Sequence, residues 1–204
     1  MTVATEVRRG RKFDQVLEGA RQIFMRDGFE GASVDDIAQA AGVSKATLYS
    51  YFPDKRLLFM EVARCECAEQ ADQTSVEITA DAGARKVMTY VAERIMNFTT
   101  SQMGLQMYRI CVAESVRFPE LGEAFFSSGP EVMVARLSEY FEQAEALGEL
   151  SIPDKRLASF QFAEMCKSDM WLQMILGLRT EITPEERRCV IEGAVDMFMA
   201  RYGT

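Results

Sequence analysis

Helical periodicity is the feature that most limits what this chain can fold into. Apolar residues recur at steps of three and four along most of its 204 residues, and no stretch alternates long enough to be a convincing strand. The first such run covers residues 11–27 and ends at Gly28, a residue type that commonly stops a helix. The pattern predicts an all-α fold, and the 48% hydrophobic content supports a substantial core.

Two short helices joined by a tight turn are expected next. Ser33 can cap the first, with Asp36 three residues later, and Gly42 ends it. Ser44 can cap the second, which is expected over residues 45–51. Two short helices around a glycine turn, with a third behind them, are the helix-turn-helix arrangement, in which the second helix of the pair enters the DNA major groove. A small helical bundle with the same kind of turn is the alternative.

The second helix of this pair and the residues just after it carry groups suited to a DNA surface. Small, hydroxylated, phenolic and cationic side chains contact phosphates and base edges. Those present are Ser44, Lys45, Ala46, Thr47, Tyr49, Ser50, Tyr51 and Lys55. Leu48 and Phe52 are expected to face inward and hold the helix on its neighbours.

The pentapeptide PDKRL occurs at residues 53–57 and again at residues 153–157. In each copy the proline prevents the preceding segment from continuing as a helix, and the aspartate can cap the next helix. Both copies are interpreted as helix starts, with Lys155 and Arg156 expected as solvent charges. The helix after the first copy is expected from Lys55 to beyond Glu66. Further helices are expected near residues 82–100, 104–117, 119–126, 130–147, 154–177 and 184–202.

The charge is unevenly distributed along the chain. The net charge of -8, from 23 Lys and Arg against 31 Asp and Glu, argues against non-specific coating of nucleic acid or of an anionic membrane. Residues 1–60 hold 9 basic and 8 acidic side chains, whereas residues 61–204 hold 14 and 23. A nearly neutral N-terminal part can meet DNA with its basic side chains while an acidic part projects away.

Several classes of site are excluded by composition. The chain has no histidine, which removes the commonest general base, the Ser-His and Cys-His nucleophiles and the usual metal ligand. Its five cysteines lack a CxxC spacing, so reduced and mostly buried thiols are expected, with a redox-sensing thiol as the alternative. No apolar run approaches the ~20 residues that span a bilayer, and no signal peptide is evident. We therefore expect a cytoplasmic protein without a metal, a cofactor or a membrane partner.

A cluster of carboxylates raises the alternative of an enzyme. Glu139, Glu142, Glu145 and Glu149 are spaced so that several share one helix face, as acid/base groups or metal ligands would. Because they have no histidine partner, a solvated helix face is the favoured interpretation. We expect that the protein is not an enzyme.

Residues 11–60 resemble the N-terminal domain of the TetR family of bacterial transcriptional repressors. The matching positions are Ala20, Phe24, Gly28, Phe29, Ser33, Ile37, Ala38, Ala41-Gly42-Val43-Ser44, Thr47-Leu48-Tyr49, Tyr51-Phe52 and Asp54-Lys55. Ala46 and Arg56 depart from the pattern, where the family often has glycine and glutamate. The resemblance implies a homodimeric, ligand-released repressor with a DNA-binding domain over residues 1–54 and a helical ligand-binding and dimerisation domain over residues 55–204.

The resemblance also implies roles for individual side chains at the DNA. Lys45 and Thr47 are expected at bases, and Ser33, Tyr49 and Lys55 at phosphates. Ser44 and Tyr51 complete the set that the resemblance places along the DNA. A basic arm is expected to touch the DNA backbone or the minor groove, with a solvated terminus as the alternative. It consists of Arg8, Arg9, Arg11 and Lys12.

Residues 61–204 hold most of the 13 methionines and several aromatic residues. Flexible methionines suit a pocket for varied apolar molecules, and they also simply fill cores. The candidate effector-binding residues are Arg94, Phe98, Met103, Met107, Tyr108, Glu114, Phe162, Met165, Trp171 and Met174. For each of them an ordinary core or surface role is the alternative.

Residues 170–176 are apolar around nearly the whole helix circumference, which predicts cover on two sides. Together with the last helix they are expected to form a seam between two copies, giving a four-helix dimer interface. The candidate seam residues are Trp171, Ile175, Val190, Ile191, Ala194, Val195 and Phe198. A helix buried within one chain is the alternative.

Taken together, these features predict a ligand-responsive regulator that binds a palindromic double-stranded DNA operator as a homodimer. A small, hydrophobic effector of unknown identity is expected to release it by changing the spacing of the two DNA-binding domains relative to successive major grooves. A helical dimeric adaptor without DNA binding is the alternative.

Overall fold

Eleven helices make up the part of the chain that the structure describes. The computed structural model describes residues 10–74 and 83–204, and for residues 66–74 it describes the backbone alone. The helices are α1 (Arg11–Gly31), α2 (Val34–Ala40), α3 (Lys45–Tyr51), α4 (Lys55–Thr74), α5 (Ala84–Thr99), α6 (Gln102–Glu114), α7 (Pro119–Ser128), α8 (Pro130–Ala146), α9 (Lys155–Met165), α10 (Met170–Ile175) and α11 (Pro184–Tyr202). These ranges contain no strand, and Leu150 and Gly203 form an isolated antiparallel bridge. The all-α prediction is confirmed.

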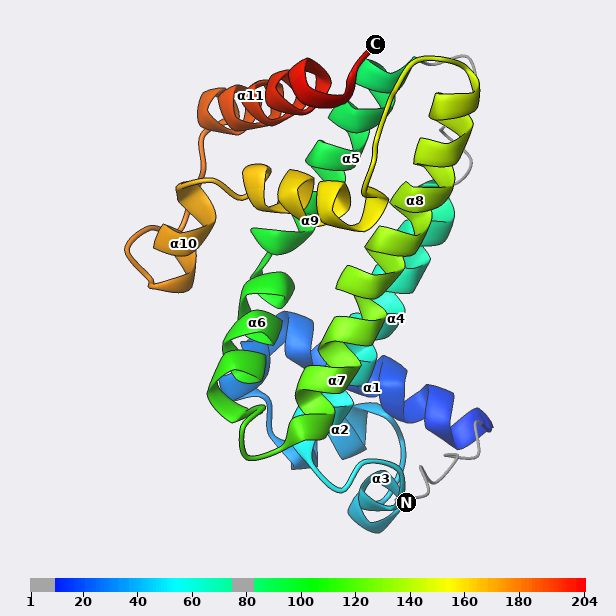
Figure 1. Ribbon diagram of the computed structural model, residues 1–204. Coiled ribbons are helices and arrows are strands. Elements are labelled where there is room, and N and C mark those ends of the chain that lie inside the picture. The colour runs from blue at the N-terminus through cyan, green and yellow to red at the C-terminus, as the bar shows by residue number, and fades with distance from the viewer. Residues whose placement is uncertain (1–9, 75–82) are drawn as a thin grey trace.

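Helices α1, α2 and α3 form a head at one end of the molecule (Figure 1). Helix α4 leads from the head into the body, which consists of α5 to α11. Val16, Ile37 and Leu48 lie in the head core with exposed fractions of 1% or less. Complete burial of such an aliphatic side chain contributes about 1.5–3 kcal/mol to folding. Helix α1 approaches α2 so closely that a Cβ at Gly19 would lie 2.5 Å from the backbone nitrogen of Ala41, so the crossing requires glycine.

The core of the head continues into the body. Leu58 of α4, Ile110 of α6 and Leu121 of α7 belong to the same buried cluster as Val16. Helices α6 and α7 therefore pack directly against the elements that carry α3. A displacement of α6 reaches the head through side chains that are already in contact.

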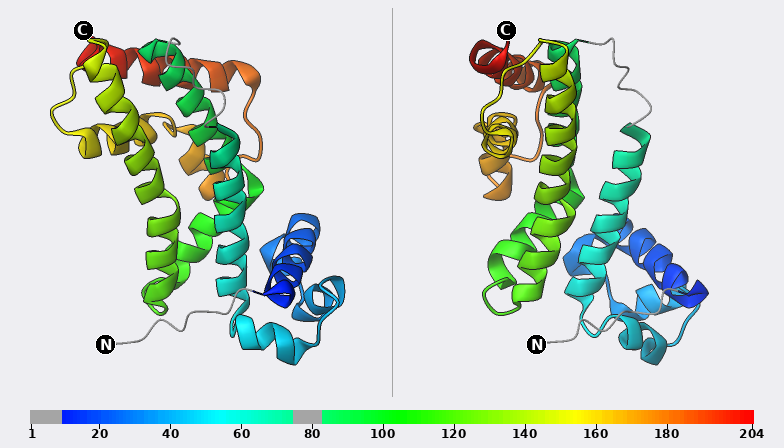
Figure 2. Two further views of the ribbon diagram at one scale, coloured as in Figure 1. Left: turned by 90° about the vertical axis from the view of Figure 1, so that its right-hand side faces the viewer. Right: turned by 45° about the vertical axis from the view of Figure 1, so that its right-hand side comes forward.

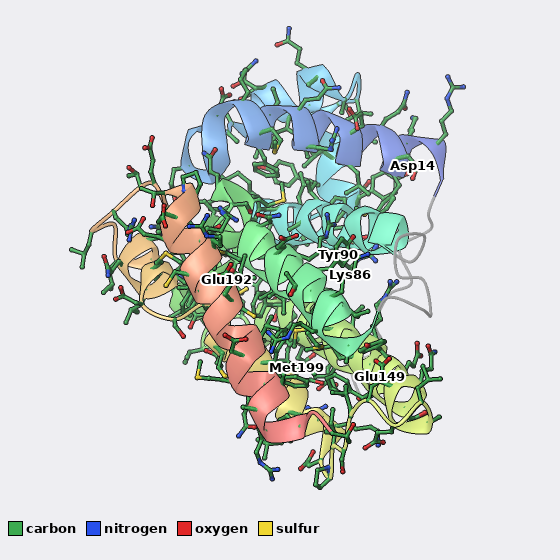
Figure 3. The ribbon with its side chains drawn as sticks, turned by 90° about the horizontal axis from the view of Figure 1, so that it is seen from above. Asp14, Lys86, Tyr90, Glu149, Glu192 and Met199 are labelled. Carbon is green, nitrogen blue, oxygen red and sulfur yellow. The ribbon has the colours of Figure 1, made fainter. Side chains whose placement is uncertain are left out.

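A second core lies in the body among α5, α8, α9 and α11. The ring of Phe198 stands 5.6 Å from that of Phe141 and 5.1 Å from that of Phe162, centroid to centroid. Figure 2 shows α11 at the end of the body remote from the head. Figure 3 shows α11 beside α5, with Glu192 on α11 and Tyr90 on α5.

Most helix boundaries follow the local signals in the sequence. At Gly28 the φ angle is 71°, so the first helix breaks there as expected, and one further helical turn follows up to Gly31. In the two PDKRL copies, Asp54 accepts a hydrogen bond from the N–H of Arg56 (2.7 Å) and Asp154 from that of Leu157 (2.9 Å). Both copies start helices, as predicted.

The charges of the second PDKRL copy differ from the prediction. Lys155 Nζ lies 2.8 Å from a carboxylate oxygen of Glu145, and Arg156 binds both carboxylate oxygens of Glu131. These contacts join the start of α9 to α8. Arg156 is exposed, as expected for a solvent charge, whereas the expectation was wrong for Lys155, which is half-buried. Sequence did not indicate either partner, because both lie on another helix that only packing brings near.

The helix expected over residues 154–177 is broken into α9 and α10. The chain turns at Cys166–Asp169, and Asp169 has a φ angle of 62°, in the left-handed region that non-glycine residues seldom adopt. Neither glycine nor proline marks this break in the sequence. Cys166 and Met170, on either side of the turn, both lie in the body core.

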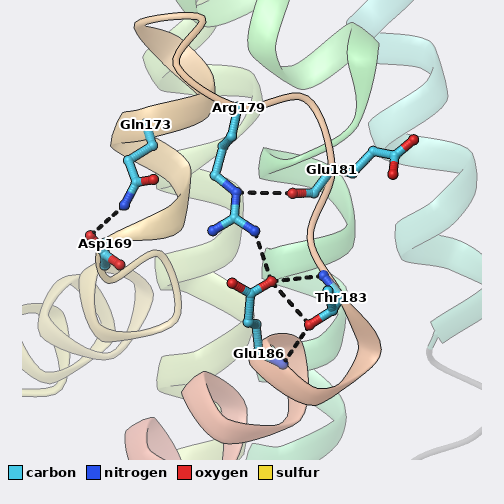
Figure 4. A network of polar contacts seen from close by, with 6 residues as sticks. All are labelled: Asp169, Gln173, Arg179, Glu181, Thr183 and Glu186. Atoms are coloured by element: carbon cyan, nitrogen blue, oxygen red, sulfur yellow. Dashed lines mark hydrogen bonds and ion pairs between the residues drawn. The ribbon is translucent and has the colours of Figure 1, made fainter.

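The segment between α10 and α11 is held by a network of polar contacts (Figure 4). Thr183 and Glu186 form a capping box at the start of α11. Arg179 donates from Nη2 to the Glu186 carboxylate (2.7 Å) and from Nε to the carbonyl of Glu181 (2.9 Å). The hydrogen bond from Arg179 and those from the N–H and the hydroxyl of Thr183 lower the pKa of Glu186 to about 2. The network fixes the approach of the chain to α11.

Candidate nucleic-acid interface and effector region

Helices α2 and α3 are each closed at the N-terminus by a serine. Ser33 Oγ accepts the N–H of Asp36 (3.0 Å), and Ser44 Oγ accepts the N–H of Thr47 (3.1 Å). Gly42 supplies the positive φ angle of the turn between the helices, 62°. The predicted pair of capped helices around a glycine turn is therefore present.

Helix α3 has one buried face and one exposed face. Leu48 is buried at 1% exposure, and Phe52 just after the helix at 6%. Tyr51 is half-buried, and its ring meets that of Phe13 edge-on with centroids 5.7 Å apart. These contacts hold α3 on α1, so that its other face points to solvent.

The exposed face of α3 carries most of the predicted DNA-binding residues. Tyr49 is 47% exposed. The others that lie exposed are Ser44, Lys45, Ala46 and Ser50, with Thr47 half-buried. All three of these serine and threonine hydroxyls already have partners nearby, because Ser50 donates to the carbonyl of Thr47 (2.6 Å) and Ser44 shares a hydrogen bond with the Thr47 hydroxyl (2.9 Å).

Lys45 pairs with a residue that the sequence pattern does not single out. Its ammonium lies 2.5 Å from a carboxylate oxygen of Asp35, the second residue of α2. Both side chains are exposed. The pair joins the first turns of the two helices of the motif.

Lys55 lies between the head and α4 and is bound by the protein. Its Nζ donates to the carbonyls of Phe29 (2.9 Å) and Ala32 (3.0 Å), and it stands 4.5 Å from the centroid of the Phe29 ring. These bonds hold the end of α1 on the start of α4. A phosphate contact by Lys55 stays a prediction, and in this structure the ammonium has other partners.

The remaining predicted DNA residues lie at the margins of this surface. Ser33 is exposed before α2, and Arg11 and Lys12 are exposed at the start of α1. Arg8 and Arg9 lie outside the described residues.

The expected effector-binding residues do not form one group. Phe98, Met103 and Met107 belong to or pack against the core shared by the head, α6 and α7. Phe162 and Met165 belong to or pack against the body core. For these five residues the structure supplies the core role that was the alternative.

The third group lies where α10 packs on α6. The rings of Tyr108 and Trp171 meet edge-on with centroids 4.6 Å apart, and Met174 is buried. Arg109 on α6 donates from Nη2 to the carbonyl of Met174 (2.7 Å) and from Nε to that of Ile175 (3.1 Å). Because carbonyls at a helix end have few helical partners, Arg109 acts as a cap that fastens α10 to α6.

The two polar candidates for effector binding lie apart from each other. Arg94 is half-buried on α5. Glu114 is half-buried at the end of α6, and its carboxylate pairs with Arg56 of α4. Effector contact by either stays a prediction.

Open grooves occur elsewhere on the described surface. One of about 600 Å³ lies between α1 and α2 and is lined by Asp14 and Gly19 among others. Another of about 470 Å³ lies between α5 and α11 and is lined by Asn97 and Arg187. No expected effector-binding residue lines either groove.

Two models of known families match this chain. The model described as "Bacterial regulatory proteins, tetR family" matches residues 16–62, and the model described as "AefR-like transcriptional repressor, C-terminal domain" matches residues 86–204, more than half of the chain. The chain belongs to the TetR family. The first match covers α2, α3 and the turn between them, so the expected resemblance is confirmed.

Solved TetR-family structures resemble the whole chain. A TetR-family regulator from Mesorhizobium loti is 26% identical with a TM-score of 0.80, over 98% of this chain and 100% of that one. The flavonoid-responsive regulator FrrA is 34% identical with a TM-score of 0.68, over 96% of this chain and 98% of that one. The TetR fold therefore extends through α11.

Curated TetR-type repressors match over shorter stretches. The repressor AcnR of Corynebacterium efficiens is 37% identical over 75 residues, which are 37% of this chain and 40% of that protein. The biofilm operon regulator IcaR of Staphylococcus aureus is 31% identical over 52 residues, 26% of this chain and 28% of that protein. The chain thus spans less than half the length of these relatives. Both relatives are named as transcriptional regulators.

The residues of the dimer seam expected for this TetR-family protein differ in exposure. Ile191, Ala194, Val195 and Phe198 are at most 5% exposed and belong to the protein's own body core. Helices α5 and α9 pack against this apolar stripe of α11, and its contact with a second copy stays a prediction. Trp171, Ile175 and Val190 are half-buried, and their contact with a partner stays a prediction.

The carboxylates of α8 do not gather into a site in this TetR-family body. Glu139 and Glu142 are exposed, and Glu145 pairs with Lys155. Among the described residues no group of three or more carboxylates and thiols is placed to hold a metal ion. In the same ranges no helix is long and apolar enough to cross a membrane.

The described thiols differ in accessibility. Burial raises the pKa of Cys111 to about 11 and that of Cys166 to about 12, so neither forms a thiolate readily. Cys65 is half-buried and Cys189 is exposed on α11. The side chain of Cys67 lies outside the described residues.

Proposed function

We propose that this protein is a DNA-binding transcriptional repressor that binds a palindromic operator as a homodimer and is released by a small hydrophobic effector. The observation that carries the proposal is the pair of serine-capped helices α2 and α3, with α3 held by Leu48 and presenting Tyr49 to solvent. DNA recognition requires a helix whose buried face fixes it to the protein and whose polar face is free to enter the major groove of DNA.

The proposed DNA contacts divide by chemistry. Lys45 and Thr47, at the N-terminal end of α3, are assigned to base edges. Ser33 and Tyr49 are assigned to phosphates, since hydroxyls and phenols there position the head without reading sequence. Lys55 is assigned to a phosphate only if it leaves the carbonyls that it binds in this structure.

The proposed effector site lies between α6 and α10. It is supported by the aromatic contact of Tyr108 with Trp171 and by the burial of Met174. The related regulator FrrA is flavonoid-responsive, and planar aromatic molecules suit a pair of rings such as this one. Because these side chains pack on one another, we propose that α10 moves away from α6 to admit the effector.

The proposed dimer uses the outward face of α11. Cys189 and Met197 are exposed on this face, and a Cβ added at Gly193 would meet nothing within 4 Å. Gly193→Arg therefore tests the proposal, because the protomer tolerates the added side chain and a packed partner does not. The expected result, measured by light scattering coupled to size exclusion, is a monomer with unchanged helicity. A variant that remains a dimer contradicts this interface.

DNA binding itself is tested by selecting bound duplexes from a random pool and by a gel shift with the selected sequence. We expect a palindromic site and an affinity that falls steeply with salt. Tyr49→Ala is expected to weaken binding, with Met25→Ala as the control because Met25 is exposed on α1. If wild type selects no sequence while remaining dimeric, the protein is the helical adaptor that was the alternative.

A further inference from the structure

The segment that would meet DNA is electrically balanced. Residues 33–56 hold three cationic and three anionic side chains. Lys55 binds backbone carbonyls, Arg56 binds Asp54 and Glu114, and Lys45 binds Asp35. Non-specific affinity for DNA comes from cations that neutralise phosphates, and here each cation already has a partner in the protein.

Asp35 is not required by the cap of its own helix. The cap of α2 is made by Ser33, whose Oγ also donates to the carboxylate of Asp36 (2.6 Å). The Asp35 carboxylate points instead to Lys45, the first residue of α3, and its hydrogen bond raises the pKa of Lys45. An exposed pair of this kind contributes little to folding. Its position at the proposed DNA surface gives it a different consequence.

We infer that Asp35 is a specificity-determining residue, which holds Lys45 toward a base edge and withholds it from phosphates. The inference rests on the proposed DNA-binding function.

The geometry of an ammonium group explains how one pair has two effects. Lys45 has three N–H donors, so it can keep its bond to Asp35 and offer the other two to acceptors on a guanine edge. A phosphate is attracted mainly by net charge, which the Asp35 carboxylate largely cancels, whereas hydrogen bonds to a neutral base edge need only the remaining N–H donors. The pair therefore disfavours binding through phosphates alone more than it disfavours binding to the operator.

The test compares Asp35→Asn, Lys45→Gln and the double variant with wild type on a labelled duplex of random sequence. We expect Asp35→Asn to bind this duplex about 3- to 10-fold more tightly and with a salt slope steeper by about 0.9, the value for one added phosphate contact. In the Lys45→Gln background the same change is expected to have no effect. Duplexes selected from a random pool by Asp35→Asn are expected to be less restricted in sequence than those selected by wild type.

Glu139→Gln is the matched control, since it removes the same charge from an exposed residue of α8. The inference is overturned if Asp35→Asn binds random DNA no better than this control. It is also overturned if Asp35→Asn tightens binding equally with Lys45 replaced, because Asp35 would then act by repelling DNA directly. If wild type binds no DNA at all, the proposed function fails first, and the inference with it.

Discussion

Arg56 on α4 and Glu114 on α6, 58 residues apart in the chain, form an ion pair between the segment that follows α3 and the end of α6. The same guanidinium binds Asp54 through Nε (2.9 Å) and Nη2 (2.6 Å) and lies 4.0 Å from the centroid of the Phe118 ring. Arg56 is thus the polar link between the start of α4 and the corner between α6 and α7. An effector that displaces α6 must move this link or break it.

The Arg56–Glu114 pair is expected to show a measurable coupling energy. A double-mutant cycle with Arg56→Met and Glu114→Gln, measured by urea unfolding, should give a coupling of about 0.5–1 kcal/mol, because the pair is only partly exposed. The cycle of Arg85 with Asp196, a more exposed pair, serves as the control and should give a smaller value. Equal coupling in the two cycles would remove any special role for the pair at the junction.

Lys55→Met is expected to destabilise the protein by about 1–3 kcal/mol, measured by urea unfolding. The change leaves the carbonyls of Phe29 and Ala32 without the bonds that the ammonium donates. Lys86→Met, on the exposed surface of α5, is the control and is expected to be nearly neutral. If Lys55→Met unfolds at the same urea concentration as wild type, the bonds to the end of α1 are not structural.

Ser44 combines a helix cap with a place on the proposed DNA surface, and two substitutions separate these roles. Ser44→Ala should cost about 1 kcal/mol of stability because the N–H of Thr47 loses its acceptor. Ser44→Asp retains an acceptor and should preserve the melting temperature, yet its charge should weaken binding to DNA. Anisotropy with a labelled duplex measures the second effect. An Asp variant that is both stable and fully active in binding would place Ser44 away from the DNA.

The capping box of α11 should make stability depend on pH. Glu186 has a pKa of about 2, lowered from 4.5, so the carboxylate is bound more tightly in the folded state than in the unfolded state. Its contribution is present in full above pH 4.5 and is lost as the pH falls toward 2. Glu186→Gln should therefore melt below wild type at pH 7, and the difference should shrink in acid.

Glu185→Gln removes the same charge from the same first turn of α11 and serves as the control for Glu186→Gln. Its melting temperature should stay closer to that of wild type at pH 7. A difference between wild type and Glu186→Gln that persists unchanged down to pH 2 would show that the carboxylate acts through its shape and not through its charge.

Features that depend on neighbours in the chain were predictable from the sequence. Ser33, Gly42 and Ser44 marked the two helices of the motif because a cap or a left-handed turn is made by residues within four positions of one another. Leu48 was expected to face inward, and it does. The family resemblance followed from the same local pattern.

Tertiary packing decided the rest. The break between α9 and α10 carries no glycine or proline, and the residues on either side of it, Cys166 and Met170, both lie in the body core. Lys55 binds the carbonyls of Phe29 and Ala32 at the end of α1. Arg56 pairs with Glu114 on α6. Only the folded chain brings these partners near.

The sequence by itself determined an all-α chain with a pair of short, serine-capped helices around a glycine turn, since caps, turns and the 3.6-residue period are short-range properties. It did not determine which apolar faces remain for a ligand or a second copy. The stripe of Ile191, Val195 and Phe198 suits an interface between copies as well as a core within one chain. Only the folded protein assigned it to the core, because burial depends on which helices lie opposite.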